Sequence, residues 1–168
     1  MLVMMGACSS KKNYSISDSA YEVEYHKVDM SKYPGVSSVN HQFVQVEAKE
    51  LFNAYENGGT GIFVLSATWC PHCRTLMKII NEVASERNLT IYYVSGDKEG
   101  DYPITDEDIE RYKEIFGDYL NEEDGKKVVL MPHVIALGCG EVVYSKISGD
   151  DEKNITNEYR KAFSQFTQ

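Results

Sequence analysis

A largely apolar run, residues 62–67, stands just before the segment Trp69-Cys70-Pro71-His72-Cys73. An apolar run of this length without polar alternation is typical of a strand that is buried on both faces of its sheet. The residues after it repeat apolar side chains at helical spacing, with Leu76, Ile79, Ile80 and Val83 on one stripe. The two cysteines are therefore predicted to lie where a buried strand gives way to an amphipathic helix.

The rest of the chain alternates strand and helix patterns. We expect strands at 21–28, 41–46, 62–67 and 90–94, helices at 48–57, 71–87, 105–116 and 151–166, and a hairpin of 133–137 with 141–146. Thr105 is the predicted cap of its helix, with Asp108 three residues on. This order predicts an α/β domain whose central mixed sheet joins parallel βαβ units to an antiparallel edge and is flanked by helices.

Charge is distributed unevenly along the 168 residues. The whole chain has 17 basic and 26 acidic residues, a net charge of −9, and 42% hydrophobic residues. That composition fits one domain with a real core and argues against binding to phosphate backbones, so nucleic acid is not an expected partner. Residues 96–126 carry twelve acids and four bases, 4 − 12 = −8, whereas 57–81 carry no acid. We expect the acidic segment to fold away from Cys70, because nearby carboxylates would disfavour a thiolate there.

The N-terminal segment, Met1 to Lys12, resembles the end of a bacterial lipoprotein signal: apolar residues, Gly6-Ala7, Cys8 and then a polar stretch. The resemblance implies a lipid anchor on Cys8, with 1–20 as signal remnant and flexible tether and 21–168 as the domain. Two features depart from the pattern, Met5 in the usual place of Leu and a leader of seven residues with no basic region. The alternative is a cytosolic N-terminus with an incidental cysteine. No run approaches the roughly 18 apolar residues that a spanning helix needs.

Cysteines at i and i+3 of a first helical turn are close enough to close a disulfide. Pro71 suits the first helical position, since the missing N–H is not needed there. Free backbone N–H groups and the positive end of the helix favour a thiolate at Cys70, and His72 and the bases after it act in the same direction. Cys70 is the predicted nucleophile and Cys73, more shielded, the resolving thiol.

Together, the strand, Ala67-Thr68-Trp69-Cys70-Pro71-His72-Cys73, the helix and a later Met131-Pro132 before a hairpin resemble the thioredoxin superfamily over 43–166. The resemblance implies a thioredoxin-like fold with a cis proline at Pro132, which places Met131 and Pro132 beside Cys70 as substrate-binding residues. It makes 96–126 an acidic helical insertion before the cis-proline strand. Cys-Pro-His-Cys is also the motif of periplasmic disulfide oxidases, in which the histidine stabilises the reduced thiolate. In layout the chain is most similar to short extracytoplasmic thioredoxin-like lipoproteins of the bacteriocin transport accessory type.

One departure from thioredoxin concerns the proton of the resolving thiol. Where that family often has a buried acid six residues before the first cysteine, this chain has Val64. Proton transfer would then use water or another group, with His72 and His133 as candidates.

Other chemistries stay open for the cysteine pair. Cys70 and Cys73 could form a structural disulfide or half of a zinc site, for which His133 and Cys139 are the remaining ligand candidates. A copper- or zinc-handling protein would use Cys70, Cys73 and His133 as ligands. A non-catalytic secretion accessory protein would use the fold only to hold a partner. Cys139 has no role that the sequence assigns.

The favoured interpretation is a thiol–disulfide oxidoreductase. Cys70 and Cys73 are its catalytic residues, Trp69, Pro71 and His72 tune the pair and form its rim, and no cofactor is needed beyond the Cys70–Cys73 disulfide itself. Its expected partners are protein thiols and disulfides and a membrane redox protein. The expected location is extracytoplasmic, in a bacterial cell envelope, with membrane contact through the N-terminal lipid only.

Overall fold

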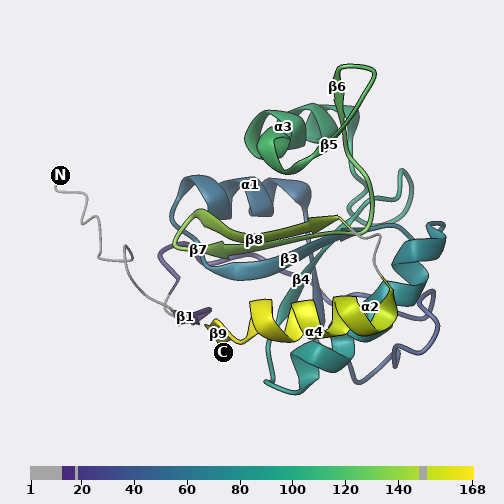
Figure 1. Ribbon diagram of the computed structural model, residues 1–168, viewed down its shortest axis with the longest axis vertical. Helices are drawn as coiled ribbons and strands as arrows, with labels where there is room; N and C mark the ends of the chain where they lie inside the picture. Colours follow the sequence, from purple (N-terminus) through teal and green to yellow (C-terminus); the bar gives the residue numbers. More distant parts are fainter. Residues whose placement is uncertain (1–12, 18, 148–150) are drawn as a thin grey trace, which may run out of the picture.

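A five-stranded mixed sheet forms the centre of the molecule, as Figure 1 shows for the computed structural model, which describes residues 13–17, 19–147 and 151–168. The strands, in spatial order, are β2 (Phe43–Val46), β4 (Ile91–Ser95), β3 (Gly61–Ser66), β7 (His133–Gly138) and β8 (Glu141–Ile147). The first three are parallel, and β7 and β8 are antiparallel to their neighbours. These strand directions confirm the predicted mixed α/β sheet. β3 lies at its centre and is buried along its whole length, as its apolar run predicted.

Helices cover both faces of this sheet (Figure 1). The helices α1 (Ala48–Glu56) and α3 (Asp106–Phe116) lie together on one side, and α2 (Pro71–Ser85) packs with α4 (Glu152–Phe163) on the other. The predicted stripe of α2 is buried, as its spacing required. The Thr105 cap is confirmed as well: its hydroxyl accepts from the Asp108 N–H at 3.0 Å, and the Asp108 carboxylate accepts from the Thr105 N–H at 2.9 Å.

The predicted strand 21–28 is wrong, although its residues do cover the edge of the sheet. Only one isolated bridge, His26 to Gln45, joins this segment to β2. The buried carboxylate of Glu50 accepts hydrogen bonds from the Tyr21 hydroxyl and the Glu24 N–H. Because a side chain from α1 satisfies these polar groups, the segment needs no strand ladder.

The predicted tether also begins to fold earlier than expected. Two residues, β1 (Tyr14–Ser15), pair in parallel with β9 (Phe166–Thr167), and Ile16 is buried. The ring of Tyr14 lies 5.4 Å from that of Phe166, so a buried aromatic contact orders a segment whose composition is polar. The packed domain therefore starts before residue 21. The predictions for Met1 to Lys12, including the Cys8 anchor, lie outside the described residues.

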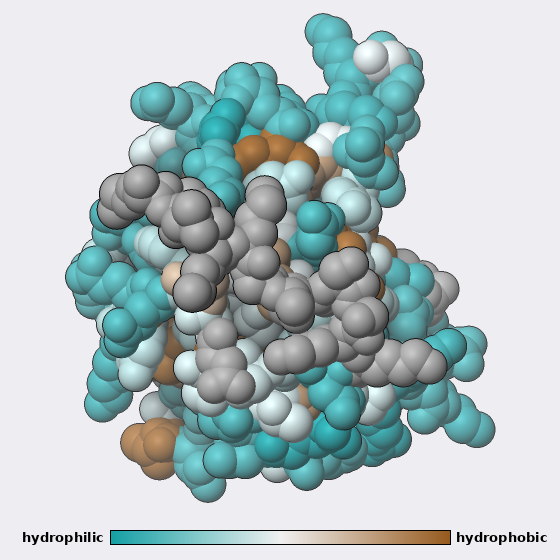
Figure 2. Space-filling model, turned by 90° about the vertical axis from the view of Figure 1, so that its left-hand side faces the viewer, coloured by the Kyte–Doolittle hydropathy of each residue, from teal (hydrophilic) through white to brown (hydrophobic). Residues whose placement is uncertain are grey.

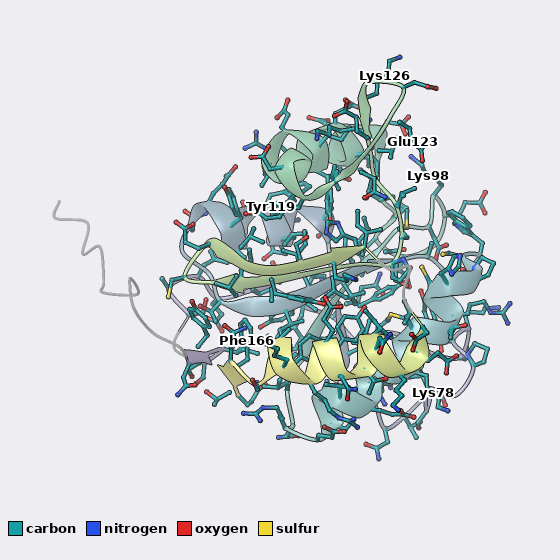
Figure 3. The ribbon with its side chains drawn as sticks, viewed as in Figure 1. Lys78, Lys98, Tyr119, Glu123, Lys126 and Phe166 are labelled. Atoms are coloured by element: carbon teal, nitrogen blue, oxygen red, sulfur yellow. The ribbon has the colours of Figure 1, made fainter. Side chains whose placement is uncertain are left out.

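The acidic segment contains α3, the short helix η1 (Gly117–Tyr119) and a hairpin of β5 (Asn121–Glu123) with β6 (Lys126–Val128). The hairpin was not predicted, although Asp124 and Gly125, both with positive φ, are a typical two-residue turn. Figure 3 shows Glu123 and Lys126 at the top of the molecule, far from Lys78 on α2. This top is hydrophilic, as is most of the face in Figure 2. Within the described ranges, no helix combines the length and apolar character needed to cross a membrane.

Candidate active site

Cys70 and Cys73 are the free cysteines of the described chain, and both lie at the start of α2. Cys70 is the N-cap, Pro71 begins the helix, and the Cys73 N–H donates to the Cys70 sulfur at 3.4 Å. Cys70 is 5% exposed and Cys73 is 0% exposed. The predicted difference in shielding between the two thiols is therefore present, with Cys70 slightly exposed and Cys73 not exposed at all.

A cis peptide bond joins Met131 to Pro132, as the family resemblance implied. β7 follows this bond and pairs with β3, with His133 opposite Leu65. Met131 therefore lies near the end of β3, on the side where Cys70 caps α2. The Cys70 thiol donates to the Met131 carbonyl at 3.4 Å. The predicted juxtaposition of Met131 with Cys70 is thus confirmed.

Gly96 makes room for the Met131 side chain. A Cβ atom on Gly96 would lie 2.2 Å from the Met131 sulfur and 3.4 Å from the Ala67 Cβ, so the methionine fills the space that a side chain there would take. Glycine at this position therefore allows the close packing that sets Met131 beside the thiol.

One acid of the 96–126 segment does return to the active-site loop, contrary to the simple separation expected from the sequence. The Asp97 carboxylate accepts from the Thr68 N–H at 3.1 and 3.3 Å and from the Thr68 hydroxyl at 3.2 Å. These bonds hold the loop between β3 and α2. No local sequence pattern indicates this contact, because the two residues belong to different βα loops.

Trp69 and His72 lie on the surface beside the cysteines. Trp69 is 66% exposed, which fits the predicted rim, and His72 is exposed on the first turn of α2. A large exposed aromatic ring next to a reactive thiol offers an apolar contact for a partner chain.

His133 does not join the cysteines, so its candidate roles as metal ligand and proton carrier are wrong. It is fully buried, its Nδ1 lies 2.9 Å from the Tyr112 hydroxyl of α3, and its Nε2 lies 2.8 Å from the Ser145 hydroxyl. Both ring nitrogens are thus engaged, and burial lowers the pKa of the imidazole to about 4. Among the described residues no cluster of three or more His, Cys, Asp or Glu could hold a metal ion. Cys139 lies in the turn between β7 and β8 with a positive φ, and its N–H donates to the Thr60 hydroxyl at 2.9 Å.

The thiol of Cys73 faces a group of buried hydroxyls that the sequence did not reveal. The Tyr33 hydroxyl lies 3.0 Å from the Ser66 hydroxyl and 3.0 Å from the Tyr93 hydroxyl. The Tyr93 hydroxyl also donates to the Ser66 carbonyl at 3.2 Å. Burial, with a smaller contribution from Cys70, raises the pKa of the Cys73 thiol to about 12, and the Ser66 hydroxyl acts in the opposite direction.

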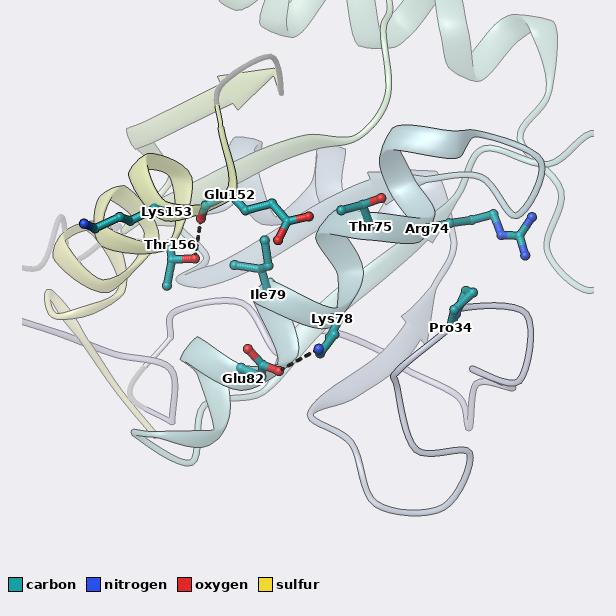
Figure 4. Close-up of a pocket in the computed structure, with 9 residues that line it drawn as sticks. All are labelled: Pro34, Arg74, Thr75, Lys78, Ile79, Glu82, Glu152, Lys153 and Thr156. Atoms are coloured by element: carbon teal, nitrogen blue, oxygen red, sulfur yellow. Dashed lines mark hydrogen bonds and ion pairs between the residues drawn. The ribbon is translucent and has the colours of Figure 1, made fainter.

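A groove of about 530 Å³ runs between α2 and α4 on the flank of the site (Figure 4). Its lining mixes basic and acidic side chains from both helices, including Arg74, Lys78, Glu82, Glu152 and Lys153. The lining holds no cysteine, so the groove adjoins the dithiol without containing it.

The sheet order, the helices on both faces, the cysteine pair that begins α2 and the cis proline before β7 define a thioredoxin-like fold. Among solved structures, thioredoxin NaTrxh from Nicotiana alata aligns with a TM-score of 0.50 at 15% identity, over 80% of this chain and 100% of that one. Oxidised thioredoxin O1 from Arabidopsis thaliana aligns with a TM-score of 0.47 at 17% identity, over 76% and 99% of the two chains. A scan against protein-family models and a search of curated proteins gave no match. At this identity the first alignment supports the fold alone.

Proposed function

We propose that this protein is a thiol–disulfide oxidoreductase that exchanges disulfides with protein substrates through Cys70 and Cys73. The observation that carries the proposal is the placement of two free thiols on the first turn of α2, with the slightly exposed one 3.4 Å from the backbone carbonyl before a cis proline. A partly accessible thiol at a helix N-terminus is the arrangement that favours a nucleophilic thiolate.

The reaction proceeds in two exchanges. The Cys70 thiolate attacks a substrate disulfide, forms an S–S bond to one substrate sulfur and releases the other as a thiolate. Cys73 then loses its proton and attacks the Cys70 sulfur, which forms the Cys70–Cys73 disulfide and releases the second substrate thiolate. The substrate disulfide is reduced by two electrons and the cysteine pair is oxidised by two. In the reverse direction the same pair donates its disulfide to a reduced protein.

Substrate binding uses the surface around Cys70. The backbone of Met131 borders the thiol, and an extended partner chain can pair with it as an added strand would. The exposed ring of Trp69 supplies an apolar contact on the rim. This arrangement suits an extended segment of a protein better than a small disulfide. A peptide has a backbone that can pair with Met131 and side chains that can contact the Trp69 ring.

Cysteine replacement tests the proposal. Cys70→Ser is expected to abolish both insulin reduction and oxidation of a dithiol peptide, whereas Cys73→Ala is expected to accumulate a mixed disulfide on Cys70. Thr75→Ser, at an exposed position of the same helix, serves as the matched control. Insulin reduction and dithiol oxidation that are unchanged in the Cys70→Ser protein would reject Cys70 as the nucleophile. Cellular activity that survives replacement of both cysteines would favour a non-catalytic accessory protein.

The cellular location is part of the same proposal: the protein works outside the cytoplasm, anchored to a bacterial membrane by a lipid on Cys8, and exchanges electrons with a membrane redox partner. The sequence from Met1 to Lys12 supports it. So does the position of Tyr14, which packs on Gly138 at one end of β7, whereas Met131 precedes the other end. Met131 and Gly138 are seven residues apart, and seven residues of extended chain span roughly 20 Å. A chain anchored through its N-terminus would thus present Cys70 away from the membrane.

Mass spectrometry of protein from the membrane fraction tests the anchor. A mass increase from acyl chains on an N-terminal Cys8 is expected. A lipidated cysteine cannot also form a disulfide, so a Cys8–Cys139 disulfide, or a soluble chain that keeps Met1, would refute the anchor.

A further inference from the structure

The proton of Cys73 has no direct route to solvent. Cys73 is fully buried, and the resolving step requires this thiol to lose its proton while a pKa of about 12 holds the proton in place. Among the described residues, the groups that lower this pKa are the Ser66 hydroxyl and the backbone of Ala67. The polar side chain next to the thiol on this side is therefore a hydroxyl, that of Ser66.

The hydroxyl of Ser66 begins a chain of buried hydrogen bonds. It lies 3.0 Å from the Tyr33 hydroxyl, which lies 3.0 Å from the Tyr93 hydroxyl. All three residues are buried, and the two tyrosine rings meet edge to face at 6.0 Å. Packing therefore fixes the hydroxyls in contact. A hydroxyl can accept a proton and donate its own in the same event, so this chain can carry a proton without becoming charged for long.

The far end of the chain approaches the surface. The Ser95 hydroxyl interacts with Tyr93 and accepts from the Asp97 N–H at 3.2 Å. The Asp97 carboxylate is near enough that its charge contributes to raising the pKa of Tyr93 to about 12, for which burial is the larger cause. Asp97 is partly exposed, so its edge of the site meets solvent.

We propose that Ser66, Tyr33 and Tyr93 form a proton relay that carries the Cys73 proton to the Asp97 edge of the site during the resolving step. The inference rests on the proposed dithiol exchange. As the Cys73 sulfur bonds to the Cys70 sulfur, the S–H bond of Cys73 breaks and its proton enters the relay at Ser66. The Tyr93 hydroxyl, which donates to the Ser66 carbonyl at 3.2 Å before the step, turns and releases its proton to water at the Asp97 edge. The electron pair of the broken mixed disulfide departs on the substrate sulfur.

Val64, on the same face of β3 as Ser66, offers no ionisable group that could take the proton instead. The titratable groups that face Cys73 are Cys70 on its own helix and, from the segments packed against it, Tyr33 and Tyr93, with Asp97 acting on Tyr93. The side chains that lead from the thiol toward Asp97 carry hydroxyls, which makes a path of hydroxyls the arrangement that fits.

Stopped-flow reaction of the fully reduced chain with dithiobis(nitrobenzoate) separates the two steps. Attack by Cys70 releases one coloured thiolate, and attack by Cys73 on the resulting mixed disulfide releases a second. Cys73→Ser should remove only the second release. The relay variants are Ser66→Ala, Tyr33→Phe and Tyr93→Phe, each of which deletes one hydroxyl. Tyr112→Phe, which deletes a buried hydroxyl that bonds His133 instead, is the matched control.

At neutral pH each relay variant is expected to slow the second release by about 10- to 100-fold, at the low end of what positioned acid–base groups contribute, and to leave the first release unchanged. The gap should narrow as the pH rises toward about 10, because hydroxide that reaches Cys73 during local opening of the site then removes its proton without the relay. Tyr112→Phe should match the wild type throughout.

The outcomes are distinguishable. Wild-type rates of second release in all three variants would overturn the relay while leaving the dithiol chemistry intact. Slowing by the same factor at every pH would also overturn it, because a packing defect alone predicts that result. Absence of any release from the reduced wild-type protein would overturn the proposed function and the relay together.

Discussion

The buried imidazole of His133 predicts a specific pH dependence of stability. Burial lowers its pKa from 6.5 to about 4 in the folded protein. Between these two values the unfolded chain binds a proton on His133 and the folded chain does not. Because the unfolded state then holds more protons, the free energy of unfolding falls as the pH falls through this window.

The magnitude follows from the two pKa values. One pKa unit corresponds to about 1.36 kcal/mol, so a difference of about 2.5 units between 6.5 and about 4 amounts to about 3 kcal/mol. This contribution is fully present above the unfolded pKa and is lost below about pH 4. Carboxylates titrate near the lower end of the window, so the wild-type curve alone does not isolate the histidine, and a variant without the imidazole is required.

His133→Gln removes the titrating ring. At pH 7.5 the variant is expected to be less stable than the wild type, because the hydrogen bonds to Tyr112 and Ser145 are disturbed. The stability difference should shrink by about 3 kcal/mol between pH 7.5 and pH 4. Urea unfolding followed by far-ultraviolet circular dichroism, repeated across this pH range, measures it.

Ser145→Ala is the control, since it removes one hydrogen bond and keeps the imidazole buried. Its curve should be displaced from the wild-type curve and retain the slope between pH 6.5 and pH 4. If the His133→Gln curve instead runs parallel to the wild type over the window, the histidine is not held neutral by burial and the reasoning is refuted.

Three further predictions concern single contacts. Gly96→Ala places a Cβ 2.2 Å from the Met131 sulfur, so it should destabilise the fold by about 1–3 kcal/mol and slow mixed-disulfide formation at Cys70. Gly117→Ala, where a Cβ would have no atom within 4 Å, is the control. Equal effects of the two substitutions in thermal unfolding would contradict the packing argument. Thr105→Ala removes a capping box and should lower the free energy of unfolding in urea by about 1 kcal/mol. Thr105→Ser keeps the capping hydroxyl and should retain most of this stability. Glu50→Ala removes the acceptor of the Glu24 N–H and should speed hydrogen exchange of that amide, while amides of β3 keep their wild-type protection; unchanged exchange at Glu24 would show that Glu50 does not hold the 21–28 segment.

Local patterns in the sequence were enough to predict most of the sheet and the four α-helices of the described residues. The apolar run of β3, the helical stripe of α2 and the Thr105 cap each depend on neighbours a few residues away, so their signals are present in the chain itself. The same is true of the cysteine pair, whose spacing and helix start do not depend on distant residues.

Segments with weak local signals were decided by partners far along the chain. The alternating pattern of 21–28 reads as a strand, but Glu50 satisfies its polar groups from another element. Tyr14 is ordered by Phe166 at the opposite end of the sequence. Neither partner can be identified from a window of neighbouring residues, because each contact is created by the fold.

The sequence by itself determined where the two thiols lie, since Cys70-Pro71-His72-Cys73 at a helix start already predicts one thiol at the end of the helix and a more shielded second one. Only the tertiary structure decided what surrounds them. The fold buries the His133 side chain in the core, and it brings the Asp97 carboxylate to the loop between β3 and α2. It also gathered hydroxyls from residues 33, 66 and 93 beneath Cys73. The physical reason is that the reactivity of a thiol begins with local helix geometry, whereas the path of its proton depends on side chains that only long-range packing places within hydrogen-bonding distance.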